Sequence, residues 1–484
     1  HHGEASLAST IVGLAQDYVG SNNVNILVPS GQFGTRLAGG KDHASPRYIF
    51  TRLAPICRAI FPESDDAMLD YMNEDGQVIE PEHYLPILPL ILVNGADGIG
   101  TGWSTSIPNY NPRDIVANIR HILDDEDVER MHPWYRGFNG DITEETIKGE
   151  VRYHISGKYE IQDDCTLVIN ELPLRSWTSD YKAFLEGMMT TKDAKGNATV
   201  PFITDYKEYH TDTVVHFVVT MTPEHMEAAK KEGIESKFKL TSKVSTTNMH
   251  LFDEKGAITK YTTPESILAA FMPLRLKAYE KRRVMLIRQA ESELKRMSNK
   301  VRFIIAVVDG ELSIGRKKKS VLVEELESMS FDRMPKTQKV AAAPTVEEGD
   351  AEEGAEEAAD TGASYDYLLS MPLWNLTQEK VEELMEEQTA KTTEVQNLHN
   401  TTDKELWRLD LDTFEEAMDT FDEEEAKLAA DMAKTKRTAQ HNKTKGGKKA
   451  LAKKFAKKGA KKASSDSEGN DDDDEEEDLS DDEF

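Results

Sequence analysis

The chain has 484 residues, with 59 Lys and Arg against 88 Asp and Glu, and a formal net charge of −29. This length predicts about two to four domains. The two cysteines, Cys57 and Cys165, exclude a disulfide scaffold or a cysteine-based zinc cluster and indicate a reducing compartment. No apolar run approaches the roughly 18 residues of a membrane span, and no charged-then-apolar leader is present. We therefore expect neither a membrane protein nor a secreted one.

The charge is distributed unevenly along the chain. Residues 434–463 carry thirteen basic and no acidic side chains, whereas residues 464–484 carry thirteen acidic and no basic ones. Residues 346–360 add eight acids without a base. Residues 31–60 run the other way, with five basic side chains against the single acid Asp42. Although a net charge of −29 argues against a nucleic-acid partner, this local basic patch keeps such a partner open.

The first predicted element is an amphipathic helix near the N-terminus, because Leu7, Ile11 and Leu14 recur at helical spacing. Residues 29–46 are rich in glycine, serine and basic residues and predict a loop. A short helix is expected over residues 48–61, after Pro46.

Residues 84–94 are a continuous apolar run with prolines, which predicts a buried strand or an extended segment. The sequence NGADGIGTGW at 94–103 predicts a tight, glycine-rich turn. Residues 112–260 alternate short helices with β-type runs and predict a mixed α+β domain with an antiparallel sheet. Its expected strands are 150–155, 166–169 and 214–221.

From Pro264 to Val308 the pattern changes to one long helix, whose apolar residues step by three and four positions as in a coiled-coil seam. A second helical region is expected around 376–409. The two predict an antiparallel helix pair with a small globular tip. The seam candidates are Leu294, Met297, Val301, Ile304 and Val308 on the first helix, and Val395 and Leu398 on the second.

Two glycine-rich segments are weak matches to nucleotide-binding loops. The glycines of residues 94–102 do not have the dinucleotide-binding spacing. Residues 34–42 miss the P-loop spacing by one residue, and Asp42 replaces the Ser or Thr that would hold Mg²⁺. Neither segment is interpreted as a nucleotide site.

Residues 94–102 instead offer one isoleucine, Ile99, flanked by Gly98 and Gly100. Such an apolar tip can wedge between base steps and kink DNA. The alternative is a hairpin tip that folds back onto its own core.

Arg47 and Tyr48 directly follow the basic loop. A tyrosine with the usual pKa of about 10 is a poor nucleophile unless a cation stabilises its phenolate. An adjacent guanidinium can do this and can also neutralise a phosphate under attack. The alternative is an Arg-Tyr pair with a structural role on the surface.

Longer blocks of sequence resemble one family. Five of them closely resemble eukaryotic DNA topoisomerase II, a type IIA enzyme, and the resemblance weakens from residue 1 to about 425. The blocks are HHGE at 1–4, VGSNN at 19–23, GQFGTRLAGGKDHASPRYIFT at 31–51, EPEHYLPILPLILVNGADGIGTGWST at 80–105 and ITDYKEYHTDT at 203–213.

The resemblance implies catalytic roles. Tyr48 matches the nucleophile of the family, which attacks a backbone phosphate and forms a 5′-phosphotyrosyl link that preserves the phosphodiester energy for religation. Arg47 matches the neighbouring arginine that stabilises charge in the transition state. His2 matches the histidine placed near the scissile phosphate.

The resemblance also implies DNA contacts. Ile99, with Gly98 and Gly100 beside it, matches the intercalating isoleucine that bends the cleaved DNA segment. Lys41 and Arg36 lie in the segment that contacts the DNA backbone in the family.

The implied fold class is a multidomain α+β protein. Residues 1–80 would form a partial winged-helix (CAP-like) domain with the catalytic tyrosine, and residues 81–262 a mixed α+β tower domain. Residues 263–415 would form a long antiparallel coiled coil with a C-terminal dimerisation gate, carrying an acidic disordered insert at 346–362. Residues 416–484 would be a disordered charged tail, basic and then acidic.

The family changes DNA topology by transient double-strand cleavage, ATP-dependent strand passage and religation. Its ATPase domain and its metal-binding acidic domain have no counterpart in this sequence. We therefore expect Mg²⁺ and ATP to be cofactors of the full-length enzyme, bound by domains absent from this chain. The fragment alone is expected to be inactive.

The implied partners are double-stranded DNA and a second copy of the chain, in the nucleus. The lysine-rich residues 448–462 suit a nuclear address or a sequence-blind DNA contact. Ser465 and Ser480 precede acids at +3 and suit a kinase that acts on the acidic tail. An alternative of another class stays open: a non-enzymatic, dimeric coiled-coil protein that binds DNA architecturally.

Overall fold

The structure, a computed structural model, describes residues 3–147, 149–190, 200–314, 317–334, 364–372, 378–428 and 430–431. The chain divides into two compact units, residues 1–415 and residues 416–484. The predicted acidic insert and most of the predicted tail lie outside the described residues. The start of that tail is helical over 416–428, where Met418, Phe421 and Leu428 lie at helical spacing, so the prediction of disorder is wrong there.

The N-terminal segment contains short helices, loops and one hairpin. Helix α1 (Glu4–Ala15) forms where expected, but it buries Val12 and Ala15, whereas Leu7 is 63% exposed. The predicted apolar face of this helix is therefore only partly correct. The later elements are η1 (Pro46–Tyr48), α2 (Cys57–Ile60), α3 (Glu63–Asp66) and the antiparallel pair β1 (Tyr71–Glu74) and β2 (Gln77–Pro81).

The helix predicted over residues 48–61 is wrong for most of its length. Phe50 exchanges two backbone hydrogen bonds with Ser30, at 3.1 and 3.2 Å, so the chain is extended after Tyr48. Pro55 explains the difference, because proline has no N–H to donate and disfavours helical geometry in the residue before it.

The prediction for residues 84–94 is half correct. Residues 84–89 form neither helix nor strand, but helix α4 (Leu90–Asn94) begins directly after Pro89. The predicted tight turn joins two antiparallel strands, β3 (Ala96–Gly100) and β4 (Trp103–Ile107). Helix α5 (Pro112–Leu123) follows.

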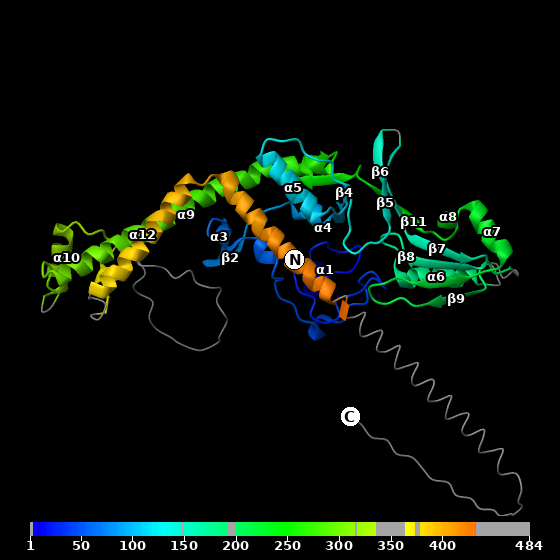
Figure 1. Ribbon diagram of the computed structural model, residues 1–484, viewed down its shortest axis with the longest axis horizontal. Helices are drawn as coiled ribbons and strands as arrows, with labels where there is room; N and C mark the ends of the chain where they lie inside the picture. Colours follow the sequence, from blue (N-terminus) through cyan, green and yellow to red (C-terminus); the bar gives the residue numbers. More distant parts are fainter. Residues whose placement is uncertain are drawn as a thin grey trace, which may run out of the picture. The chain divides into compact units, whose positions relative to one another are not determined.

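The predicted mixed α+β region is confirmed, with more than one antiparallel sheet. The strand orders are β11-β6-β5, β7-β8-β10-β9 and β12-β13. Helix α6 packs on the four-stranded sheet through a buried apolar cluster that includes Leu185 and Phe217 (Figure 1). The strands are β5 (Asp141–Ile147), β6 (Glu150–Ser156), β7 (Lys158–Asp163), β8 (Thr166–Glu171), β9 (Asp205–Glu208), β10 (Phe217–Thr220), β11 (Thr241–Ser245), β12 (Met249–Phe252) and β13 (Ile258–Tyr261), and the helices are α6 (Thr178–Met188), α7 (Pro223–Glu232) and α8 (Ile234–Lys237).

The long helix α9 (Pro264–Val308) has the predicted bounds. It begins with a capping box in which Thr263 accepts from the backbone N–H of Ser266 at 3.2 Å and Ser266 Oγ accepts from the Thr263 N–H at 3.3 Å. Proline at the first helical position adds to this start signal.

Among the described helices, none combines the length and the apolar character that a membrane span requires.

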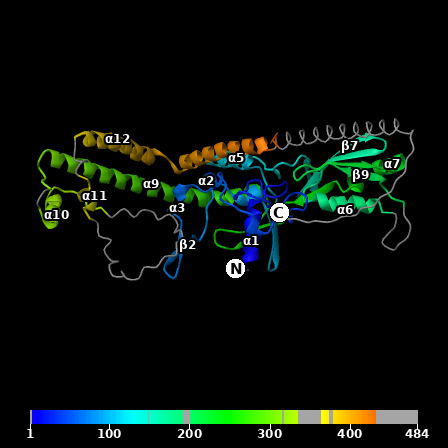
Figure 2. The same cartoon turned by 90° about the horizontal axis from the view of Figure 1, so that it is seen from below.

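Helix α12 (Gln378–Asn400) lies along α9 in Figure 1 and Figure 2. Lys391 of α12 pairs with Glu293 of α9 at 2.6 Å, and His399 of α12 pairs with Glu291 of α9 at 3.0 Å. Residue numbers therefore increase along α12 in the direction in which they decrease along α9. The predicted antiparallel pair is therefore confirmed. Of its seam candidates, Val301, Ile304 and Val395 are buried, Leu294, Met297 and Leu398 are half-buried, and Val308 is exposed.

A small apolar cluster surrounds the far end of α9, as the predicted globular tip requires. Phe303 of α9 packs there with Leu326 of α10 (Lys319–Ser328) and Leu368 of α11 (Asp366–Leu369). Beyond α12, residues 403–415 are again helical and return along the first half of α9.

A buried cluster of charges joins α9 to two distant parts of the chain. Arg275 is fully buried and donates to Asp65 of α3 at 2.6 Å. Arg282, two turns further along α9, donates to Asp410 at 2.5 Å. Burial raises the pKa of Asp65, and the neighbouring Arg275 partly offsets this rise.

Aromatic packing completes this junction. Tyr279 stacks on Trp407 with ring centroids 5.4 Å apart, and its hydroxyl donates to Asp410 at 2.7 Å. Trp407 is fully buried and donates its indole N–H to the carbonyl of Ile87 at 2.9 Å. Four parts of the chain therefore meet at this junction: α3, residue Ile87 just before α4, helix α9, and the helix of residues 403–415.

We predict that Arg275→Ala destabilises the protein by about 3–5 kcal/mol, because it leaves Asp65 buried without its closest cation. The control is Arg58→Ala, which breaks an exposed pair with Asp66 and should cost about 0–1 kcal/mol. The midpoint of chemical denaturation measures both. Equal shifts in the two variants would contradict a special role for this junction.

Candidate active site and nucleic-acid interface

Tyr48 is the last residue of η1 and is 67% exposed. Pro46 opens the turn, and the backbone N–H of Tyr48 donates to the carbonyl of Ser45 at 3.0 Å. The guanidinium carbon of Arg47 lies 5.0 Å from the centre of the Tyr48 ring. An exposed phenol with a cation at its ring is therefore presented to solvent. His2, the third predicted catalytic residue, lies outside the described residues.

The backbone after Tyr48 is firmly held although its side chain is exposed. The N–H of Val28 donates to the carbonyl of Arg52 at 2.9 Å, and the N–H of Ala54 donates to Ile26 at 2.8 Å. Together with the Ser30–Phe50 pair, these bonds attach residues 50–54 to residues 26–30. On the other side, Ile49 packs against the buried cluster around α1.

Three cations of the predicted basic patch remain available at the surface. Lys41, Arg47 and Arg52 are exposed, and none of them forms an ion pair with another described residue. Arg58 is paired with Asp66 at 3.1 Å. The exposed basic patch therefore contains fewer unpaired cations than the five basic residues that the sequence places in residues 31–60.

Arg36 is not part of this surface, which corrects its predicted role. Its guanidinium is buried, forms an ion pair with Glu171 at the end of β8, and lies 3.4 Å from the carbonyl of Leu172. A side chain enclosed in this way cannot reach the DNA backbone in this structure. Arg36 instead fixes the loop that carries Lys41 onto the neighbouring sheet.

The loop of residues 34–42 is filled by its own contacts, so it offers no phosphate cradle. A Cβ at Gly34 would lie 2.6 Å from Gly40, and a Cβ at Gly39 would lie 2.3 Å from the Trp177 ring. Asp42 accepts from both the N–H and the hydroxyl of Thr35, at 2.9 and 2.5 Å. Burial raises the pKa of Asp42, but these hydrogen bonds outweigh it and the pKa is lowered.

The second exposed feature is Ile99, which is 93% exposed. It stands opposite Ser104 near the tip of the β3–β4 hairpin. The alternative in which the tip folds back onto its core is therefore wrong in this structure. A Cβ at Gly98 would meet nothing within 4 Å, whereas one at Gly100 would lie 2.7 Å from Trp103, so Gly100 allows the close approach of that ring.

The hairpin rests on β12 along the side of β4. The N–H of Ser106 donates to the carbonyl of Asn248 at 2.8 Å, and the N–H of His250 donates to the Thr105 hydroxyl at 3.1 Å. Trp103 packs edge-on against Phe252, with ring centroids 5.7 Å apart. Ile99 is thus exposed on a hairpin that β12 supports.

Buried asparagines tie the root of this hairpin to the segment before the tyrosine loop. The side-chain amide nitrogen of Asn23 lies 2.9–3.1 Å from the carbonyls of Val93, Tyr110 and Trp134. Its oxygen accepts from the N–H of Arg136 at 2.9 Å. Asn23 is 2% exposed, and its bonds to Val93 and Tyr110 are buried, so these two are shielded from water.

Asn94 makes a matching contact from the hairpin side. Its oxygen accepts from the Val24 N–H at 2.9 Å, and its nitrogen donates to the Val24 carbonyl at 2.8 Å. Gly95 follows with φ of 67°, and a Cβ there would lie 2.4 Å from the Asn109 side-chain oxygen. Residues 21–30, which we call the bracing segment, thus hold the hairpin root at one end and the extended residues 50–54 at the other.

Sequence reasoning missed this asparagine clamp. Asn23 and Asn94 both lie in blocks that carried the family resemblance, but no periodicity singles out a side chain that bonds to carbonyls far along the chain.

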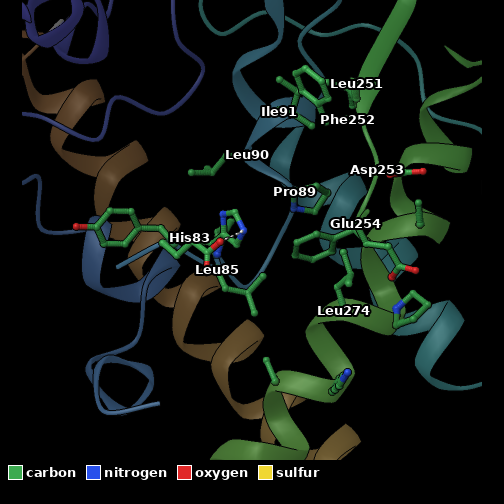
Figure 3. A pocket seen from close by; sticks show the side chains of 18 of the residues that line it. His83, Leu85, Pro89, Leu90, Ile91, Leu251, Phe252, Asp253, Glu254 and Leu274 are labelled. Carbon is green, nitrogen blue, oxygen red and sulfur yellow. Dashed lines mark ion pairs between the residues drawn. The ribbon is translucent and has the colours of Figure 1, made fainter. Parts of the chain in front are cut away.

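The structure also contains a pocket of about 1280 Å³ bounded by residues 82–91, 251–256 and the first half of α9. Figure 3 shows apolar side chains around it, among them Leu90, Phe252 and Leu274. Neither Tyr48 nor Ile99 lines it. Within the described residues, no three His, Cys, Asp or Glu side chains gather as metal ligands.

Comparison with known proteins identifies the class. DNA topoisomerase 2 of Arabidopsis thaliana is 48% identical over 440 residues, covering 88% of this chain and 30% of the relative. DNA topoisomerase 2-alpha of Gallus gallus is 45% identical over 459 residues, covering 94% of this chain and 29% of the relative. The chain thus spans less than a third of these curated relatives.

A solved structure agrees with the sequence relatives. The crystal structure of the Plasmodium falciparum topoisomerase II DNA-binding, cleavage and re-ligation domain superposes with a TM-score of 0.75 at 44% identity, covering 87% of this chain and 56% of that chain. These similarities place the chain in the class of type II DNA topoisomerases and confirm the resemblance predicted from sequence. The family of the DNA gyrase/topoisomerase IV A-type subunits matches residues 1–412. The chain belongs to this family.

We predict that Arg36→Ala weakens the fold rather than a surface contact, because Glu171 would remain buried without its cation. Amide hydrogen exchange should rise in residues 34–42, while Lys41→Ala should leave this exchange unchanged because Lys41 is exposed and unpaired within the described structure. Equal exchange in wild type and Arg36→Ala would contradict the structural role.

Proposed function

We propose that this chain is the DNA-breaking and rejoining part of a type II DNA topoisomerase. The observation that carries the proposal is Tyr48, an exposed phenol next to Arg47 on a loop whose backbone is held on both sides. Lys41 and Arg52 add exposed positive charge to the same segment. A nucleophile, a charge-stabilising cation and a phosphate-attracting surface occur together.

In the proposed reaction, the Tyr48 hydroxyl loses its proton and its oxygen bonds to a backbone phosphorus. The bond from that phosphorus to the 3′ oxygen breaks, and the 3′ hydroxyl leaves with a proton. The 5′ phosphate stays on the tyrosine, so religation by the reverse step needs no new energy source. Arg47 neutralises the phosphate as it is attacked. His2 is proposed to hydrogen-bond a phosphate oxygen.

Ile99 is proposed to insert between base steps and bend the cleaved duplex. Its exposure on a supported hairpin favours this role, because an apolar side chain in water gains by burial between bases. Gly98 and Gly100 keep the tip narrow, since neither carries a side chain beside the isoleucine.

The domain assignment follows the family. Residues 1–80 are proposed to be a partial winged-helix domain, residues 81–262 the tower, and residues 263–415 a coiled coil with a dimer gate. The antiparallel packing of α9 and α12 and the apolar tip support the last assignment. A homodimer would present two tyrosines, one for each DNA strand.

Other features of the family are proposed for the protein as a whole. ATP and Mg²⁺ would be bound outside residues 1–484, in parts of the relatives that this chain does not match. Strand passage would then serve chromosome segregation in the nucleus. The charged tail would supply a nuclear address and a kinase target.

Tyr48→Phe should abolish covalent capture of 5′-phosphoryl DNA ends, because the attacking oxygen is gone. The assay uses labelled duplex and the chain fused to the metal-binding domain of a relative. Tyr209→Phe is the matched control, since Tyr209 is similarly exposed at 61% and should leave capture unchanged. Capture that persists in Tyr48→Phe would show that the nucleophile assignment is wrong.

Ile99→Ala should reduce DNA bending, because three carbons of the wedge are lost, while dimerisation stays intact. Fluorescence energy transfer between the ends of a labelled duplex measures the bend. Val200→Ala is the matched control, since Val200 is an exposed aliphatic residue at 80% and far along the chain from the hairpin. Unchanged bending in Ile99→Ala would rule out the wedge.

A further inference from the structure

Asp97 and Ile99 lie two positions apart on β3 and therefore project from the same face of the strand. A carboxylate so close to an inserted side chain would repel the phosphates of the duplex. In the structure, Arg175 pairs with Asp97 at 2.5 Å. Both side chains are about half exposed, so the pair lies at the surface.

Arg175 has an unusual backbone, with φ of 64°, in the left-handed region that residues other than glycine rarely adopt. The residues around it enforce this conformation. Leu174 is buried in a cluster with Tyr135 and Ile155, and the N–H of Ser176 donates to the Pro173 carbonyl at 3.0 Å. The guanidinium thus comes from a turn that a buried neighbour and a backbone hydrogen bond hold in place.

That turn is also attached to the tyrosine side of the site. The N–H of Ser179 donates to the carbonyl of Leu37 at 2.9 Å, and Trp177 packs edge-on against Tyr18 with centroids 5.7 Å apart. Arg36 reaches the same stretch through Glu171. The segment that carries Arg175 is therefore fixed to the loop that leads to Tyr48.

The two strands of the hairpin are supported differently. β4 is supported by β12, whereas β3 is the outer strand and is held from outside the hairpin by the Asp97–Arg175 pair. We propose that Arg175 is a positioning residue for DNA bending: it orients β3 relative to the tyrosine loop and neutralises Asp97, so that Ile99 can enter the duplex. This inference rests on the proposed wedge role of Ile99.

The test compares Arg175→Asp, Asp97→Arg and the double variant that exchanges the two charges. Arg175→Asp breaks the pair and adds a second acid beside Ile99, so it should lower the bent fraction of an end-labelled duplex about two- to fivefold, the range that an exposed ion pair allows. Asp97→Arg also breaks the pair but attracts phosphates, so it should lower the bent fraction by less. The exchanged pair should restore bending. Thermal midpoints should stay within the wild-type range, because exposed pairs add little stability. Lys182→Asp, which breaks an exposed pair with Glu208, is the matched control and should leave bending unchanged.

A further variant separates positioning from simple neutralisation. Asp97→Asn combined with Arg175→Gln removes both charges, and the proposal predicts reduced bending because the ion pair is lost. Full bending in this variant would overturn the positioning role, as would failure of the exchanged pair to restore it.

Ile99→Ala distinguishes the two proposals. If it removes bending while Arg175→Asp does not, the Arg175 proposal alone is wrong. If Ile99→Ala leaves bending unchanged, the wedge is wrong and the Arg175 proposal falls with it.

Discussion

The bracing segment is the constraint on which the candidate site depends. Asn23 and Asn94 bond from side chain to backbone and fix residues 21–24 to the root of the Ile99 hairpin. A few residues later, backbone bonds attach the same segment to the extended residues 50–54 that follow Tyr48. Tyr48 and Ile99, the two residues with proposed functions, therefore share one support. The buried amide of Asn23 suits this purpose, because breaking its bonds leaves polar groups shielded from water and unpaired.

A second junction connects this site to the long helices. Arg275 and Arg282 lie on α9, and their carboxylate partners come from α3 and from the returning helix at residues 403–415. Buried charge pairs tolerate little displacement, because a separated ion loses its partner without regaining water. A movement of α9 would therefore displace α3, which lies in the segment that follows the tyrosine loop.

Local signals predicted the regular elements well. The bounds of α9 followed from the change of pattern at Pro264 and from the apolar repeat, and the antiparallel partner followed from the second helical region. Local signals were misleading where proline or burial intervened. Pro55 interrupts the helix expected over residues 48–61, of which only Cys57–Ile60 are α-helical, and Pro89 started a helix instead of continuing a strand.

The candidate site was predicted through family resemblance, and the structure changed one member of it. Arg36 lies in a basic segment, but its pairing with Glu171 across 135 positions cannot be read from local sequence. The same reason hid Asn23 and Arg175, whose partners are distant in the chain. Net charge was equally uninformative, since the value of −29 includes residues 346–360 and other acids outside the exposed patch of Lys41, Arg47 and Arg52.

The most direct test of the shared support is Asn23→Leu, which removes the amide that holds three carbonyls while keeping a side chain of similar size. Covalent capture by Tyr48 and DNA bending by Ile99 should be measured on the same folded variant. If the bracing segment positions both groups, the two activities fall together. A variant that loses one activity and keeps the other at the wild-type level would contradict a common support.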